Sequence, residues 1–187
     1  MSRLFQFKFV ALQWWLLLGI ASIQAAQTPE EVGEKYITTI REDGLVACLH
    51  FWHPEGVQQL ADLLTELADV AVSKGVQPPF AEKNETAESL KKLSAKQLVE
   101  KFVKWLEREV PQITGVLKTS QVRVIGHVTD GEITYLVAKV AFEVEGEKTE
   151  QLDFYPLKKL GDEYRLMPKA EFGRVVRGWI KQIKNDR

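Results

Sequence analysis

The chain has almost no cysteine, with one residue in 187, and this excludes an internal disulfide. That residue, Cys48, follows a Leu-Val-Ala stretch similar to the cleavage box of bacterial lipoproteins. Such a box directly follows an apolar signal segment, whereas charged residues precede it here, among them Arg41. We therefore expect Cys48 to be a buried structural residue and the stability of the fold to come from packing.

The sequence also lacks an excess of positive charge, since 25 Lys and Arg residues stand against 26 Asp and Glu residues. Two of the basic residues, Arg3 and Lys8, belong to an N-terminal segment that we expect to be removed. The remaining chain has 23 basic and 26 acidic side chains, a net charge of about −3. A nucleic-acid-binding domain would favour a basic face, so nucleic acid is not expected as a partner.

Long hydrophobic runs are absent beyond one N-terminal segment, Phe9–Ala21, which is almost entirely apolar. It is too short for a comfortable membrane span of about 20 residues. Basic residues precede it and small residues follow it, which is the layout of a secretory signal peptide over residues 1–25. An uncleaved anchor is the alternative, and would be the only contact with a membrane. We expect residues 26–187 to form a single secreted or periplasmic domain.

Three segments in the first part of that domain combine helix-start signals with apolar residues at helical spacing. Thr28 and Ser94 begin capping boxes for the first and third helices, and Pro54 occupies the first position of the second. Residues 75–84 are expected to form a loop. A last amphipathic helix is predicted over residues 171–184.

Four β-rich runs separated by glycine-containing turns lie between Gln121 and Met167 and predict an antiparallel meander. The predicted fold class is therefore α+β. N-terminal helices pack on one face of a curved four-stranded antiparallel meander, and a C-terminal amphipathic helix follows.

The apolar pattern predicts which side chains of the sheet face inward. A three-residue loop over residues 129–131, with Gly131 left-handed, pairs Val124 with Leu136 and keeps charges off the apolar face. We assume that the same alternation of inward and outward side chains continues across the turn at Gly146 into the third strand. The predicted inward residues are Leu136, Ala138, Val140, Phe142, Leu152 and Phe154. The predicted outward residues are Arg123, His127, Tyr135, Lys139, Glu143, Asp153 and Tyr155.

The order of helices followed by a sheet resembles the NTF2-like α+β cone, a group that includes SnoaL-like and ketosteroid-isomerase-like proteins. The resemblance rests on three short stretches, residues 49–57, 124–128 and 135–140. The extra helix after Pro168 departs from the usual ending on a strand. The resemblance implies a cone whose mouth can hold a small apolar ligand, on a fold that hosts both enzymes and binding modules.

Isomerase-type members of that group use a strand acid and a facing hydrogen-bond donor inside the cone. The predicted inward positions here are all apolar, and the strand acid Asp153 is predicted to point outward. We therefore expect no catalytic residue and no cofactor, and interpret the chain as a non-enzymatic binding domain. The alternative is an isomerase or hydro-lyase, which an inward pair of titratable groups would favour.

The expected ligand pocket combines side chains from the helices with side chains from the sheet. The candidates are Tyr36, Trp52, His53, Phe102, Trp105, Ala138 and Phe142. His50 and His53 could share a helix face as metal ligands, but no further ligand lies at suitable spacing. Helix capping and packing are therefore expected for them, and no metal site is predicted.

The outer sheet face is predicted to mix charges with tyrosines, a composition closer to an interface than to a solvated surface. The interface candidates are His127, Tyr135, Lys139, Asp153 and Tyr155. We expect a homodimer through this face. An ordinary solvated face, or one covered by the C-terminal helix, is the alternative. The expected partner is otherwise a small apolar molecule or another protein.

Overall fold

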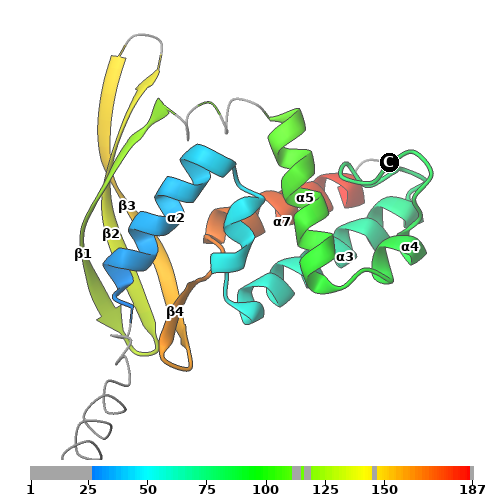
Figure 1. The fold of residues 1–187 in the computed structure, drawn as a ribbon. Helices are drawn as coiled ribbons and strands as arrows, with labels where there is room; N and C mark the ends of the chain where they lie inside the picture. Colours follow the sequence, from blue (N-terminus) through cyan, green and yellow to red (C-terminus); the bar gives the residue numbers. More distant parts are fainter. Residues whose placement is uncertain (1–26, 111–114, 116–118, 145–146, 186–187) are drawn as a thin grey trace, which may run out of the picture.

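The fold is α+β, with helices packed on one side of a four-stranded antiparallel sheet and a C-terminal helix among them (Figure 1). The computed structural model describes residues 27–110, 115, 119–144 and 147–185. The predicted signal peptide and the predicted turn at Gly146 lie outside the described residues. At this level the predicted fold class is confirmed.

The helices begin where their capping signals predict. They are α2 (Pro29–Asp43), the 3-10 helix η1 (Ala47–Phe51), α3 (Pro54–Ser73), α4 (Ala87–Lys91), α5 (Ala95–Glu109) and α7 (Ala170–Asn185). Thr28 and Ser94 form the predicted capping boxes, and the His53 ring accepts a hydrogen bond from the Glu55 N–H. The capping role of His53 is confirmed, whereas the short α4 was not predicted. In the described part of the chain, no helix is long and apolar enough to cross a membrane.

The sheet is a meander in which each strand pairs with the next along the chain. The strands are β1 (Gln121–Asp130), β2 (Ile133–Val144), β3 (Glu147–Leu160) and β4 (Glu163–Leu166). All three pairings are antiparallel, as predicted.

The first hairpin differs from the prediction because β1 contains a bulge. Asp130 pairs with Ile133, so the loop has two residues, with Gly131 in the left-handed region at φ 58°. The register shifts between Val124 and Gly126. A bulge inserts one unpaired residue and thereby reverses which side chains face inward beyond it.

The consequence is that the predicted faces hold on one side of the bulge and are wrong on the other. Val124 pairs with Ala138 and is half-buried. His127 pairs with the buried Leu136 and so points toward the helices, whereas Val128 is exposed. The prediction that His127 lies on the outer face is therefore wrong.

The predicted orientation of β3 is wrong along its length. Tyr155 pairs with Leu136 and is only 9% exposed, whereas Leu152 and Phe154 are 56% and 51% exposed. Asp153 pairs with the fully buried Ala138 and also faces the helices. The prediction carried the wrong parity from β2 to β3, and a one-residue error inverts every side chain of a strand.

The helical part is joined to the sheet at the edge strand β4. The backbone N–H of His53 donates to the Leu166 carbonyl at 2.7 Å, and Trp52 forms a parallel bridge with Leu166. The Arg165 guanidinium donates to the His50 carbonyl at 2.6 Å. These contacts occupy an edge that would otherwise present unpaired backbone groups.

We predict that Gly33→Ala is strongly destabilising, because α2 approaches the sheet most closely there. An added Cβ would lie 2.1 Å from Cδ2 of Leu136, a side chain that is almost fully buried, so it could make room only by displacing its packed neighbours. We expect the free energy of unfolding in urea to fall by about 1–3 kcal/mol.

Gly178→Ala on α7 is the matched control, since nothing lies within 4 Å of the added Cβ. It should raise the free energy of unfolding by up to about 1 kcal/mol through helix propensity. Equal effects of the two substitutions would contradict the close packing of α2 on β2.

Candidate functional site

The predicted pocket residues are distributed over the whole hydrophobic core. Tyr36 and Ala138 are buried between α2 and the sheet, while Phe102 packs among the helices against Phe80, Trp105 and Trp179. Each of three surface grooves is lined by at most one of the predicted residues. Trp105 lines one groove and Trp52 another.

A polar cluster lies beneath the sheet, at the position predicted to be dry and apolar. Asp153 forms an ion pair with Lys169, whose ammonium lies 3.8 Å from the centre of the Tyr155 ring. Burial raises the pKa of the Tyr155 hydroxyl, and the neighbouring Asp153 carboxylate raises it further. Tyr36 meets the Tyr155 ring edge-on, with the ring centres 6.1 Å apart.

Burial controls the protonation of this cluster. It raises the pKa of both Tyr36 and Tyr155, and the negative charge of Asp153 adds to the effect. Both hydroxyls therefore stay protonated over the physiological range. Nearby, the pKa of the Cys48 thiol is raised to about 12. Burial is the largest cause, and the negative charges of Asp43 and Glu107 raise the pKa further.

These interactions leave the cluster little capacity for proton transfer. Asp153 is the only carboxylate in it and already has Lys169 as a counter-ion. None of the three grooves is lined by Asp153, Tyr36 or Tyr155. The arrangement is that of an anchor between β3 and the segment leading into α7.

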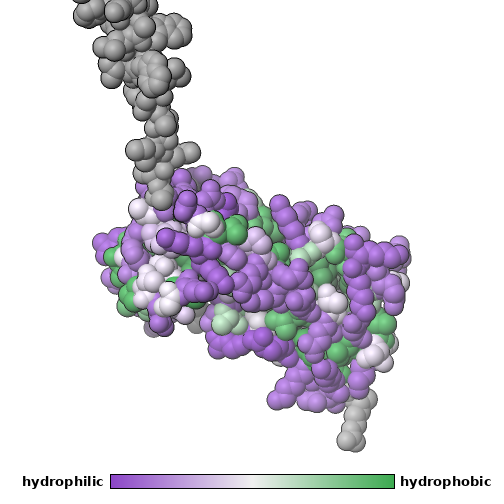
Figure 2. Space-filling view, turned by 90° about the horizontal axis from the view of Figure 1, so that it is seen from below, coloured by the Kyte–Doolittle hydropathy of each residue, from purple (hydrophilic) through white to green (hydrophobic). Residues whose placement is uncertain are grey.

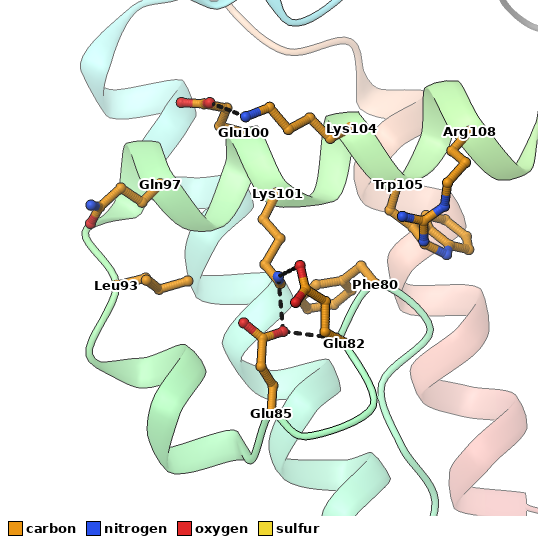
Figure 3. Close-up of a pocket in the computed structure, with 10 residues that line it drawn as sticks. All are labelled: Phe80, Glu82, Glu85, Leu93, Gln97, Glu100, Lys101, Lys104, Trp105 and Arg108. Carbon is orange, nitrogen blue, oxygen red and sulfur yellow. Dashed lines mark hydrogen bonds and ion pairs between the residues drawn. The ribbon is translucent and has the colours of Figure 1, made fainter.

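The first groove, of about 340 Å³, lies between α5 and the loop that precedes α4 (Figure 3). Lys101 points into it and pairs with Glu85 at 2.8 Å and with Glu82 at 3.3 Å, and Lys104 pairs with Glu100. Burial raises the pKa of Glu85, but the hydrogen bond and charge of Lys101 outweigh this effect and hold it below its ordinary value. Most of the charged groups of this groove pair with one another, and the two pairs of Lys101 tie the loop to α5.

The second groove, of about 480 Å³, lies between α3 and α7. It is lined by Asp62 and Glu66 on one side and by Lys169 and Arg177 on the other. Glu66 pairs with Lys184, and Lys169 belongs to the anchor under the sheet. Its charges are therefore largely committed to contacts within the protein.

The third groove, of about 460 Å³, lies where η1, the start of α3 and the start of α5 meet, and its walls are mainly apolar. Hydrophobic surface interrupts the hydrophilic surface over the helical part of the molecule when it is viewed from below (Figure 2). The groove floor consists of the buried side chains of Leu49, Trp52 and Val99. We refer to it as the apolar groove.

The polar groups of the apolar groove are few and lie at its rim. Lys96 is exposed and has no ion-pair partner among the residues that the structure describes. His50 donates from Nδ1 to the Ala47 carbonyl at 2.5 Å, which leaves Nε2 available. Gln58 and Ser94 are engaged in hydrogen bonds on their own helices.

The interface candidates divide between the two faces of the sheet. Tyr135 and Lys139 lie on the outer face as predicted, with Lys139 paired with Glu150 at 2.5 Å. Asp153 and Tyr155 face the helices, contrary to prediction. His127 also faces inward, where its Nδ1 lies 2.6 Å from the Glu30 carboxylate and lowers the pKa of that group.

Sequence reasoning missed the large apolar side chains of the outer face. They are Val128, Leu152 and Phe154. Strand alternation could have found Leu152 and Phe154 if the second turn had been given the correct length. It also missed the apolar groove, because the apolar side chains on its floor fit ordinary core stripes.

Within residues 27–110, 115, 119–144 and 147–185, no group of three His, Cys, Asp or Glu side chains could hold a metal ion. No protein-family model, no curated protein and no solved structure matches this chain.

We predict that Lys169→Met is destabilising, because it leaves Asp153 without its counter-ion and removes the cation from the Tyr155 ring. Both charged side chains are partly exposed to water, so the expected loss in free energy of unfolding is about 1–2 kcal/mol. Combining it with Asp153→Asn should cost less than the sum of the two single changes.

Lys184→Met is the control, because its pair with Glu66 is about half exposed on both sides. Its effect should stay within about 0.5 kcal/mol. If urea denaturation gives the same loss in free energy of unfolding for both lysine substitutions, the Asp153–Lys169 pair stabilises the fold no more than a surface ion pair does.

Proposed function

We propose that this chain is an exported, non-enzymatic domain that binds a small apolar molecule in the apolar groove. The observation that carries the proposal is the character of this groove, which combines mainly apolar walls with few polar groups. Its volume of about 460 Å³ falls within the usual range for small-molecule sites. The first groove is lined largely by charged side chains that pair within the protein. The second contains four charged side chains, of which Glu66 and Lys169 are ion-paired.

The rigidity of the walls supports a preformed site. Trp52 packs against the Phe172 ring at 5.8 Å and is bridged to β4 at Leu166. Val99 lies on α5 and is fully buried. A site with fixed walls loses little conformational freedom when a ligand binds.

The rim of the groove favours a ligand with one polar or negatively charged end. Lys96 supplies the only cation among the lining residues, and the Nε2 atom of His50 lies on the opposite helical segment. An apolar body on the groove floor and a polar end near Lys96 would satisfy both parts of the site.

Export is part of this proposal and rests on the N-terminal sequence. Arg3 and Lys8, the apolar run and the small residues after it support a signal peptide over residues 1–25. A single buried thiol is compatible with an oxidising compartment, because it has no partner with which to form an internal disulfide.

An NTF2-like cone remains our interpretation of the architecture. The order of N-terminal helices followed by an antiparallel meander supports it. Helix α7 is an addition to the usual ending. The isomerase or hydro-lyase alternative would need a free inward acid, and Asp153, although inward, is paired with Lys169 and borders none of the three grooves.

We predict that Ala95→Phe abolishes binding of an apolar anionic probe. Ala95 lines the groove at the first position of α5, so a phenyl ring there occupies ligand space without entering the core. Titration with 8-anilino-1-naphthalenesulfonate, followed by fluorescence, should give an affinity at least about tenfold lower, or about 1.4 kcal/mol.

Ala170→Phe is the matched control, since Ala170 is the first residue of α7 and lines the α3–α7 groove. It should leave the affinity unchanged, as should Phe154→Glu on the outer sheet face. If the substitution at Ala170 or Phe154 lowers the affinity for the probe and the substitution at Ala95 does not, the apolar groove is not the binding site.

A further inference from the structure

The sheet has a second face that none of the described helices covers. All the described helices lie on one side of the sheet, and none of them lies on the other (Figure 1). On a sheet with one covered face, the open face is normally polar. Here it exposes large apolar side chains from three neighbouring strands. They are Ile125, Val128, Tyr135, Leu152 and Phe154.

The strand pairing makes most of these side chains neighbours. Val128 pairs with Tyr135, and Phe154 pairs with the half-buried Val137, so apolar residues adjoin across β1, β2 and β3. Leu152 is two residues from Phe154 on the same strand and therefore on the same face. A contiguous apolar surface of this kind marks an interaction site.

The size of this outer face fits one side of a protein–protein contact. Three long strands spaced about 4.8 Å apart and rising about 3.3 Å per residue give it dimensions of roughly 40 Å by 15 Å. Two copies face to face would bury about 1,200 Å² in total, which is the lower end of the range for specific stable interfaces. We therefore expect a dimer of moderate affinity.

The charges around the apolar centre indicate which kind of partner fits this face. Lys139 and Glu150 form an ion pair on this face, and Arg123 lies opposite Lys139 on β1. The surroundings thus carry both signs, which does not match a partner of one charge. Residues 26–187 have 23 basic and 26 acidic side chains, a net charge of only about −3, so two copies repel each other little.

From these observations we infer that two copies of this chain associate through the outer faces of their sheets. The contact is isologous, with the same patch on both copies, as in most homodimers. Tyr135 contributes from the central long strand β2, and Leu152 and Phe154 contribute from the neighbouring β3. This inference does not depend on the apolar groove, which lies on the helical part of the molecule.

The test is sedimentation equilibrium on residues 26–187, which contain every described helix and strand, at high micromolar concentration. The unsubstituted chain should have twice the monomer mass. Leu152→Glu combined with Phe154→Glu should reduce it to the monomer mass with an unchanged far-UV circular dichroism spectrum, because both side chains are already half exposed.

Val72→Glu is the control, since Val72 is comparably exposed at 46% but lies on α3. It should remain dimeric. If the double variant fails to fold, Tyr135→Arg takes its place and must also give a monomer. A monomeric unsubstituted chain, a folded outer-face variant that remains dimeric, or dissociation by Val72→Glu would overturn the inference.

Discussion

The ion pair between Asp153 and Lys169, formed beside the ring of Tyr155, holds the orientation of β3. Because side chains alternate along a strand, inward Asp153 and Tyr155 require outward Leu152 and Phe154. Full burial of a leucine or a phenylalanine is worth about 1.5–3 kcal/mol, so an isolated chain forgoes favourable burial at both positions. Association through the outer face would recover part of that free energy. The polar anchor inside and the apolar surface outside thus have one cause.

A second constraint joins the two parts of the molecule. The backbone of Trp52 and His53 is hydrogen-bonded to Leu166 of β4, and the same segment starts α3. This arrangement places Trp52 where it contacts Phe172 on one side and forms the floor of the apolar groove on the other. The groove is therefore a product of the junction between helices and sheet, and its shape depends on both.

Local chemistry predicted much of the fold. Capping residues such as Thr28 and Ser94 determine where helices begin, and they could be read directly from the sequence. The order of the strands followed from their turns. The parity of β3 could not be read in this way, because it depends on the number of residues in one turn and the apolar pattern favoured the wrong answer. Leu152 and Phe154 are more hydrophobic than Asp153 and Tyr155, so a prediction made for a single isolated chain places Leu152 and Phe154 in the interior.

The site was harder to predict for a different reason. The apolar groove brings Leu49 of η1 together with Ala95 and Val99 of α5, and each of these residues also fits an ordinary core stripe. The bulge near Gly126 reversed the face of His127, and the isolated glycine within the strand was the sequence signal that could have indicated it. Non-local packing and single-residue irregularities decide such features, and composition and periodicity do not report them.

The most direct test of the account is hydroxyl-radical footprinting of β3 as a function of protein concentration. At nanomolar concentration, Phe154 should be oxidised readily while its neighbour Tyr155 is protected. At high micromolar concentration, the oxidation of Phe154 and Leu152 should fall while that of the exposed Val72 stays constant. Protection of Phe154 together with oxidation of Tyr155 at low concentration would contradict the orientation of β3. Oxidation of Phe154 that does not change with concentration would contradict the association of the outer faces.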